Sequence, residues 1–224
     1  RFWSVWRRRA FGVPTRVGSP TRWLLEAHQR RGWAFPAATV IPNPAPAALT
    51  PARTVGAKPP WVFVGRLSAD KGAGFLGYLA AVMPGETFAC IGDGPLRPAL
   101  EAIPNVACLG PLPRESVQAA LANARGLLMP SRLQENQPTV ILEAFAQGAP
   151  VITSPNGGIP ETVGEGGIVV PLRVEAWRQA CAEMREDVAG WRKKAGSRAA
   201  AFAPEAIRMA WEALFSGIFL DVSS

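Results

Sequence analysis

The sequence predicts an α/β fold with a doubly wound parallel sheet, and three observations carry this prediction. Short apolar runs without polar alternation recur from Trp61 onward, as they do in buried parallel strands. Helical patterns separate these runs, which is typical of strand–helix–strand units. Glycine and polar residues directly follow most of the runs, at the edge where parallel sheets bind ligands. We therefore expect a Rossmann-like domain over residues 61–200.

Strands and helices are expected to alternate along this domain. The apolar runs place strands at 61–65, 87–92, 105–110, 126–130, 150–154 and 166–170. Helices are expected at 72–82, 96–102, 113–123 and 138–147, and over most of 173–216. Gly148 follows the fourth of these helices, where a glycine is typical of a helix end.

The flanking segments have a different character. Residues 1–41 carry a possible amphipathic helix at 2–11, an extended piece at 15–18, a helix from Ser19-Pro20-Thr21 to about Arg31, and a short strand at Val40-Ile41. Residues 42–60 are rich in Pro and Ala and are interpreted as an interdomain linker. Residues 201–224 are expected to form a C-terminal helix. Because the chain starts with Arg1 rather than Met, we expect it to begin inside a longer gene product.

The composition favours an anionic partner. Lys and Arg number 24 against 17 Asp and Glu, which gives a net charge of +7 and a pI of about 10.1. No zinc-finger spacing or RNA-binding signature accompanies this charge, so nucleic acid is not expected. The three cysteines, in apolar contexts, are interpreted as reduced buried thiols of a cytoplasmic protein. His28 is given a structural role, and no metal site is expected.

The first candidate site is the segment GRLSADKG, residues 65–72. Arg66 and Lys71 lie five residues apart in a strand-to-helix loop that Gly65 and Gly72 bracket. Two cations at the rim of a sheet suit a diphosphate, which offers several anionic oxygens. The alternative is a solvated loop with ordinary surface charges.

The second candidate site is a pair of glutamates around a helix start. The helix is expected to begin near Gln137-Pro138, with Asn136 as its cap, so its first amides would form an anion site. Glu135 precedes it, and Glu143 lies about two turns in, among apolar residues. A rise of about 1.5 Å per residue would separate the two by roughly 10 Å, which matches the span from ribose to hexose in a nucleotide sugar. The alternative is one glutamate complementing the helix dipole and another reaching out to solvent.

A third, weaker signal is the glycine-bracketed turn Gly92-Asp93-Gly94. The sequence contains neither the G-x-G-x-x-G pattern of dinucleotide oxidoreductases nor the P-loop pattern of NTPases.

Taken together, six motifs in this order resemble glycosyltransferase family 4, whose members are retaining enzymes of the GT-B fold. They are IPNP (41–44), FVGRLSADKG (63–72), IGDGP (91–95), ENQPTVILE (135–143), EAFAQGAPVI (143–152) and GGIPE (157–161). The resemblance covers roughly residues 40–172, and more weakly 13–40 and 173–216. It implies that this chain is the donor-binding C-terminal half of such an enzyme, with residues 1–41 as the end of the acceptor domain. It also implies that helix 201–224 can pack back on that half.

The resemblance also implies roles for individual residues. Arg66 and Lys71 would hold the donor diphosphate, Glu135 would contact the transferred sugar, and Glu143 would bind the ribose. Glu135, Arg66 and Lys71 would be the catalytic residues. The full donor-binding set would comprise Gly65, Arg66, Lys71, Gly92, Asp93, Gly110, Leu112, Glu135, Asn136, Gln137, Pro138, Thr139 and Glu143. No cofactor or metal is implied, since cations and a helix end stabilise the leaving diphosphate.

Two departures from the family pattern keep an alternative open. Most of the acceptor half is not in this sequence, and Glu135 is followed by Asn-Gln-Pro rather than the commoner Gly-Phe. The chain is therefore expected to bind donor better than it turns over, and the alternative is a non-catalytic nucleotide-binding or interaction module. Expected partners are a nucleotide sugar, a glycan or lipid-linked acceptor, and the N-terminal domain. A peripheral contact with the inner face of a membrane is considered for Phe2, Trp3, Trp6 and Arg7–Arg9.

Overall fold

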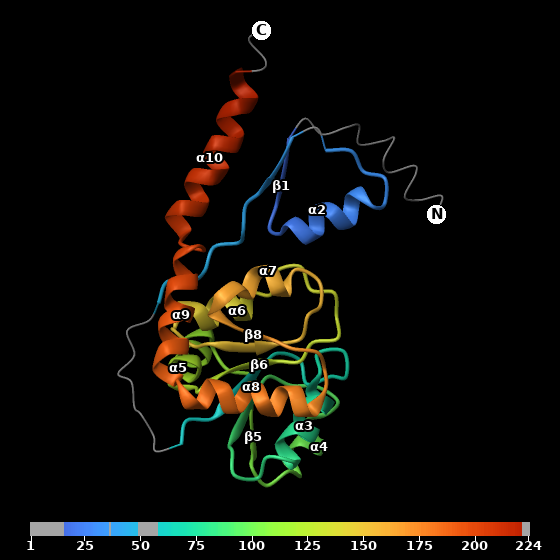
Figure 1. Ribbon diagram of the computed structural model, residues 1–224, viewed down its shortest axis with the longest axis vertical. Coiled ribbons are helices and arrows are strands. Elements are labelled where there is room, and N and C mark those ends of the chain that lie inside the picture. Colours follow the sequence, from blue (N-terminus) through green and yellow to red (C-terminus); the bar gives the residue numbers. More distant parts are fainter. Residues whose placement is uncertain (1–15, 36, 49–57, 221–224) are drawn as a thin grey trace.

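The computed structural model describes residues 16–35, 37–48 and 58–220, with side chains up to residue 216. Its centre is a six-stranded parallel sheet in the order β5-β4-β3-β6-β7-β8 (Figure 1). These strands are β3 (Trp61–Val64), β4 (Phe88–Ile91), β5 (Val106–Gly110), β6 (Gly126–Met129), β7 (Val151–Thr153) and β8 (Gly167–Val169). The predicted fold class, a doubly wound parallel sheet, is confirmed.

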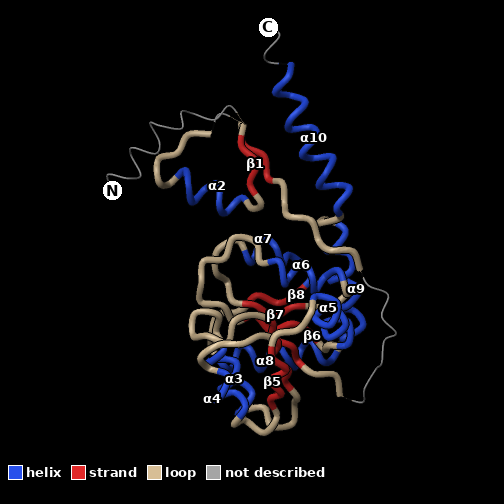
Figure 2. Tube along the Cα trace, turned by 180° about the vertical axis from the view of Figure 1, so that it is seen from behind, coloured by secondary structure: helices blue, strands red, loops and turns tan. Residues whose placement is uncertain are grey.

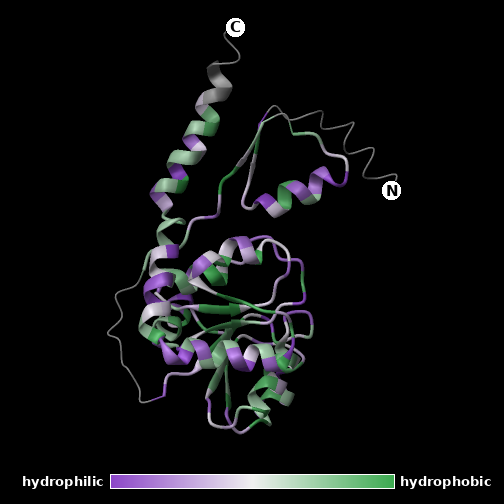
Figure 3. Ribbon diagram, viewed as in Figure 1, coloured by the Kyte–Doolittle hydropathy of each residue, from purple (hydrophilic) through white to green (hydrophobic). Residues whose placement is uncertain are grey.

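Helices cover both faces of this sheet, as the connections between parallel strands require. They are α3 (Ala73–Ala81), α4 (Arg97–Glu101), α5 (Arg114–Asn123), α6 (Thr139–Ala146), α7 (Ile159–Val163), α8 (Val174–Glu186) and α9 (Val188–Ala200), with a short 3-10 turn η1 (Gly164–Gly166). One apolar cluster joins the sheet to α5, α6 and α9, and a second joins it to α3, α4 and α8. The arrows of the central sheet are largely green in Figure 3, because their side chains are apolar on both faces.

The segment before the sheet forms a small unit of its own, called here the N-terminal unit (residues 16–45). It consists of two paired parallel strands, β1 (Val17–Ser19) and β2 (Ala38–Val40), and helix α2 (Arg22–Gln29). Thr21 is the N-cap of α2 and accepts from the amide of Leu24, so the helix starts after Pro20 rather than at it. The helix expected at 2–11, with its membrane-contact residues, lies outside the described residues.

The last helix, α10 (Pro204–Leu220), lies beside the N-terminal unit (Figures 1 and 2). Ile207 and Leu214 of α10 pack against Ile41 in a separate small core. Gly18 sits under the ring of Trp211, since a Cβ there would lie 2.6 Å from that ring. Ala45, in the segment predicted as a linker, is buried and donates its amide to the carbonyl of Phe202. The first and last segments of the described chain, the N-terminal unit and α10, therefore pack against each other.

Candidate functional site

Two loops meet at the carboxyl edge of the sheet, where the strand order changes direction. After β3 the chain adds β4 and β5 on one side and then β6 on the other, so the switch point lies between β3 and β6. Gly72 has a φ of 84°, and a Cβ there would lie 1.9 Å from the carbonyl oxygen of Pro130. Only glycine therefore allows the loop after β3 to approach the loop after β6 this closely. The amide of Arg132 donates to the carbonyl of Asp70 at 2.8 Å and joins the loops.

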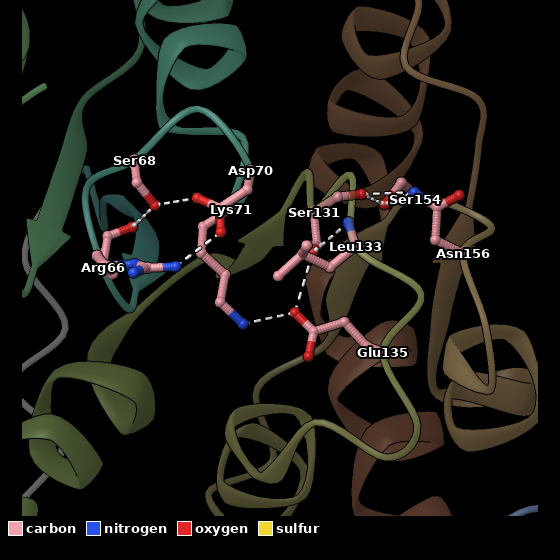
Figure 4. Close-up of polar contacts among 9 residues, drawn as sticks. All are labelled: Arg66, Ser68, Asp70, Lys71, Ser131, Leu133, Glu135, Ser154 and Asn156. Carbon is pink, nitrogen blue, oxygen red and sulfur yellow. Dashed lines mark hydrogen bonds and ion pairs between the residues drawn. The ribbon is translucent and has the colours of Figure 1, made fainter. Parts of the chain in front are cut away.

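An ion pair spans this switch point. The ammonium of Lys71, from the loop after β3, lies 2.6 Å from Oε1 of Glu135, from the loop after β6 (Figure 4). Their side chains are 32% and 18% exposed, so solvent screens the pair only in part. Two predicted site residues that are distant in sequence are thus brought into contact.

The carboxylate of Glu135 is held from a second side. The hydroxyl of Ser131, which is buried, donates to the same Oε1 at 3.0 Å. The carbonyl of Ser131 in turn accepts from the Ser154 hydroxyl and, at 2.6 Å, from the Asn156 side-chain amide. These contacts fix the orientation of Glu135 from β7 as well as from β6.

Arg66 has a different partner from Lys71. Its guanidinium lies 2.7 Å from Oδ2 of Asp70 in the same loop, and the Ser68 hydroxyl donates to the other oxygen of that carboxylate (Figure 4). The Ser68 hydrogen bond, together with the charge of Arg66, holds the pKa of Asp70 below its usual value of 3.8. The Arg66 side chain is 62% exposed and lines neither cavity described below, so the diphosphate role predicted for it requires the side chain to turn.

Two adjoining cavities open along the carboxyl edge beside this ion pair. The first, about 310 Å³, includes Lys71, Glu135 and Glu143 in its lining. The second, about 490 Å³, is lined by residues of the sheet, α5, α6 and the segment after β2: Pro44, Pro46, Val64, Leu112, Arg114, Val117, Thr139, Leu142 and Glu143. Val64, Thr139 and Glu143 belong to both linings, so the cavities together form one elongated site.

Glu143 is part of the lining of both cavities. It projects from α6, whose Ile141, Leu142 and Phe145 are buried, and is itself half-buried. Among the described residues, none forms a side-chain hydrogen bond or ion pair with Glu143. A half-buried carboxylate at a cavity wall is thereby left able to accept hydrogen bonds from a ligand.

The start of α6 differs from its prediction. The helix begins at Thr139 with Pro138 at the N-cap position, and no side chain caps it. Asn136 is therefore not the cap, and Glu135 lies in the loop before the helix, so the rise of a helix does not set its distance from Glu143. Pro138, Thr139 and Val140 line the first cavity, where the uncapped amides form a site for an anion.

Asn136 and Gln137 are turned away from the cavities. Asn136 Oδ1 accepts from the hydroxyl of Thr21 at 2.6 Å, and Gln137 Oε1 accepts from the backbone amide of Asn43 at 2.6 Å. Neither side chain is part of either lining. A role in donor binding is left only to their backbone.

The predicted glycines shape the rim of the site. Gly65, Gly92 and Gly110 follow or end β3, β4 and β5 and have positive φ. The amide of Gly65 donates to the carbonyl of Ile91, and the amide of Gly92 donates to the carbonyl of Gly110. A Cβ on Gly92 would lie 2.1 Å from the carbonyl oxygen of Gly65, so the turns pack against each other. Asp93 is exposed and accepts from the amide of Gly94, which is a turn contact.

Several residues that the structure places at the site have no site role in the sequence-based prediction. Ser131 and Asn156 support Glu135, and Arg114 lines the second cavity beside Leu112. Ser131 and Asn156 lie in the loops after β6 and β7, so the rule that selects Glu135 applies to them as well.

The ranges 16–35, 37–48 and 58–220 hold no group of three or more His, Cys, Asp or Glu side chains arranged to bind a metal ion. Within the same part of the chain, no helix has the length and apolar content to cross a membrane.

The fold and the position of the site define a GT-B Rossmann-like α/β domain. The chain belongs to the family "Glycosyl transferases group 1", whose sequence model matches residues 58–187, more than half of the chain. The GT-B part of the resemblance is thus confirmed. Assignment to glycosyltransferase family 4, with retention at the anomeric carbon, stays a prediction.

Known proteins similar to this chain are considerably longer. An exopolysaccharide phosphotransferase of Streptomyces coelicolor is 31% identical over 215 residues, covering 87% of this chain and 22% of that protein. A sulfoquinovosyl transferase of Arabidopsis thaliana is 34% identical over 112 residues, covering 48% of this chain and 22% of that protein. This chain thus spans about a fifth of the length of these two relatives.

Solved structures with this fold include sucrose-phosphate synthase from Thermosynechococcus elongatus. It has a TM-score of 0.76 and 25% identity, covering 92% of this chain and 59% of that one. HepE of Anabaena in complex with UDP has a TM-score of 0.79 and 20% identity, covering 91% of this chain and 64% of that one.

Proposed function

We propose that this chain supplies the donor-binding half of a retaining glycosyltransferase that moves a hexose from a nucleotide diphosphate to a glycan or lipid-linked acceptor. The observation that carries the proposal is the Lys71–Glu135 pair at the switch point, in a cavity that Glu143 joins to a second one. A cation, two carboxylates and an uncapped helix start in one elongated site match the parts of a nucleotide sugar. Cytoplasmic location belongs to the same proposal.

In the proposed complex the diphosphate takes the place of Glu135 as the partner of Lys71. The amides at the start of α6 and the guanidinium of Arg66, turned from Asp70, share the phosphate charge. Glu135 then accepts hydrogen bonds from hydroxyls of the sugar, and Glu143 accepts them from the ribose. The base occupies the second cavity, beside Leu112 and Gly110.

The transfer breaks the bond between the anomeric carbon and the diphosphate and forms one to an acceptor hydroxyl, whose proton passes to an oxygen of the leaving diphosphate. Negative charge develops on the leaving diphosphate. Preorganised cations and amides stabilise this charge without a metal ion. Lys71 and Arg66 supply the cations, while the acceptor is bound by the N-terminal domain.

Calorimetric titration with UDP, GDP and their hexose conjugates tests the proposal. We expect Lys71→Ala and Glu143→Ala each to weaken binding about tenfold or more, since hydrogen bonds to charged groups contribute about 1.5–3 kcal/mol. Arg178→Ala, in an exposed ion pair with Glu175 on α8, is the matched control and should bind normally. Binding of none of these nucleotides would overturn the proposal. Transfer by the full-length protein distinguishes an enzyme from a non-catalytic binding module.

A further inference from the structure

The sequence Asn136-Gln137, which departs from the family pattern directly after Glu135, has a structural role of its own. Both side chains contact the N-terminal unit rather than the cavities. The loop that carries Glu135 is therefore fastened on its far side to a different part of the molecule.

The first of these contacts is partly buried. Thr21 is 1% exposed, and its hydroxyl donates to Asn136 Oδ1 at 2.6 Å while accepting from the amide of Leu24. One hydroxyl thus caps α2 and holds the Glu135 loop. The second contact, from the amide of Asn43 to Gln137 Oε1, involves a Gln137 that is 8% exposed.

The loop between β7 and α7, which contains Gly158, packs against both segments. The amide of Gly158 donates to the carbonyl of Glu135 at 2.8 Å. A Cβ on Gly158 would lie 2.1 Å from the carbonyl oxygen of Asn136 and 2.8 Å from a methyl carbon of Thr21, so the three segments are in close contact.

Glu161, three residues further on, adds a charged contact to the same helix start. Its two carboxylate oxygens accept from the amides of Arg22 and Trp23 at 2.9 and 3.2 Å. A carboxylate at a helix N-terminus is favoured by the exposed amides and the helix dipole.

We propose that Thr21, Asn136, Gln137 and Asn43 form a latch that positions Glu135 through the N-terminal unit. This inference rests on the proposed function, because Glu135 is there the residue that receives the donor sugar. A displacement of the N-terminal unit pulls on Asn136 and so moves Glu135, while the glycine turns after β4 and β5 stay bonded to one another. The latch therefore acts on the sugar end of the site. Its four members are positioning residues.

A double-mutant cycle between Thr21 and Asn136 tests the latch. Thr21→Val removes the hydroxyl at constant volume, and Asn136→Ala removes its acceptor while leaving the cap of α2 intact. We expect each to weaken UDP-glucose about fivefold to tenfold and to leave UDP within about twofold, since one hydrogen bond is lost. The double variant should bind like the weaker single one, because both changes break the same contact. Thr21→Ser restores the hydroxyl and should recover the affinity.

Hydrogen exchange provides a readout that needs no ligand. Thr21→Val and Asn136→Ala should both raise amide exchange over residues 131–138 and leave β3 and β4 protected. Thr39→Val, at an exposed position of β2, is the matched control and should change neither readout. Unchanged exchange at 131–138 would overturn the latch.

The two readouts separate failure of the latch from failure of the proposed function. Raised exchange with an unchanged ratio of UDP-glucose to UDP affinity would overturn the coupling to the sugar end. If the unaltered chain bound no nucleotide, the proposed function would fall, and hydrogen exchange would still decide whether the latch exists.

Discussion

Nζ of Lys71 and Oε1 of Glu135 lie 2.6 Å apart across the switch point, so these two charges of the site neutralise each other. Because the pair is partly shielded from solvent, a ligand that recruits Lys71 must first displace this carboxylate. In the proposed complex Glu135 would therefore compete with the diphosphate for Lys71, and a sugar bound to Glu135 would remove this competition.

This competition predicts opposite effects of one substitution on two ligands. Glu135→Gln releases Lys71, so the affinity for UDP should rise about threefold, as expected for loss of a partly exposed ion pair. The affinity for UDP-glucose should fall, since a charged acceptor of sugar hydroxyls is lost. Parallel titrations measure both, with Lys71→Ala as the comparison that weakens both ligands. Equal losses for the two ligands with Glu135→Gln would contradict this interpretation.

The loop after β3 predicts a dependence on pH. The Ser68 hydroxyl and then Arg66 lower the pKa of Asp70 below 3.8, so the ionised carboxylate is favoured in the folded protein. The resulting stabilisation is present above pH 3.8 and is lost as the pH falls through the lowered pKa. Ser68→Ala should raise the pKa of Asp70 towards 3.8, and carbon-13 NMR titration of the carboxyl group measures it. A pKa that Ser68→Ala leaves in place would assign the shift to Arg66 instead.

A largely buried charge network lies at the amino edge of the sheet, around Glu86. Removing its central carboxylate should destabilise the protein strongly. Glu86, with a side chain 10% exposed, pairs with Arg125, which is 11% exposed, and with Arg185 at 2.9 Å, and it accepts from the indole of Trp61. Glu86→Ala leaves Arg125 buried without its carboxylate and should lower the free energy of unfolding by about 3–5 kcal/mol. Urea denaturation measures this loss. Glu175→Ala, in an exposed pair with Arg178, should cost less than about 1 kcal/mol.

The thiols predict a reactivity test. Burial raises the pKa values of Cys90 and Cys181 to about 12, and burial also raises the pKa of the half-buried Cys108. At pH 8 the thiolate fraction is therefore very small, and Ellman's reagent should react slowly with the folded protein. In guanidinium chloride all three cysteines should react at once. Rapid labelling of Cys90 in the folded state would show that β4 opens locally.

The sheet and the placement of Lys71 and Glu135 at its carboxyl edge could be predicted because they follow from local rules. Apolar runs such as Trp61–Val64 identify buried parallel strands, and the carboxyl ends of such strands meet at one edge. Residues that follow two neighbouring strands are then neighbours in space, whatever their separation in sequence.

The features that the sequence does not predict correctly depend on contact partners that no local sequence pattern shows. The sequence predicts Asn136 as a helix cap because Asn suits that position, but its side-chain oxygen accepts from the Thr21 hydroxyl of the N-terminal unit. The charge network of Glu86 was missed for the same reason, since Arg125 and Arg185 reach it only through the folding of the sheet. The predicted domain boundaries stay a prediction.

The contact between Gly18 and Trp211 has a consequence for the order of synthesis. β1 leaves the ribosome before the sheet domain, while the ring that covers Gly18 belongs to α10, which is made after that domain. Ile41 likewise cannot pack against Ile207 and Leu214 until α10 has been made. The sheet domain, whose contacts lie between these segments, can close first as translation proceeds. The N-terminal unit, although made before the sheet domain, gains its contacts with α10 only after that domain has been made.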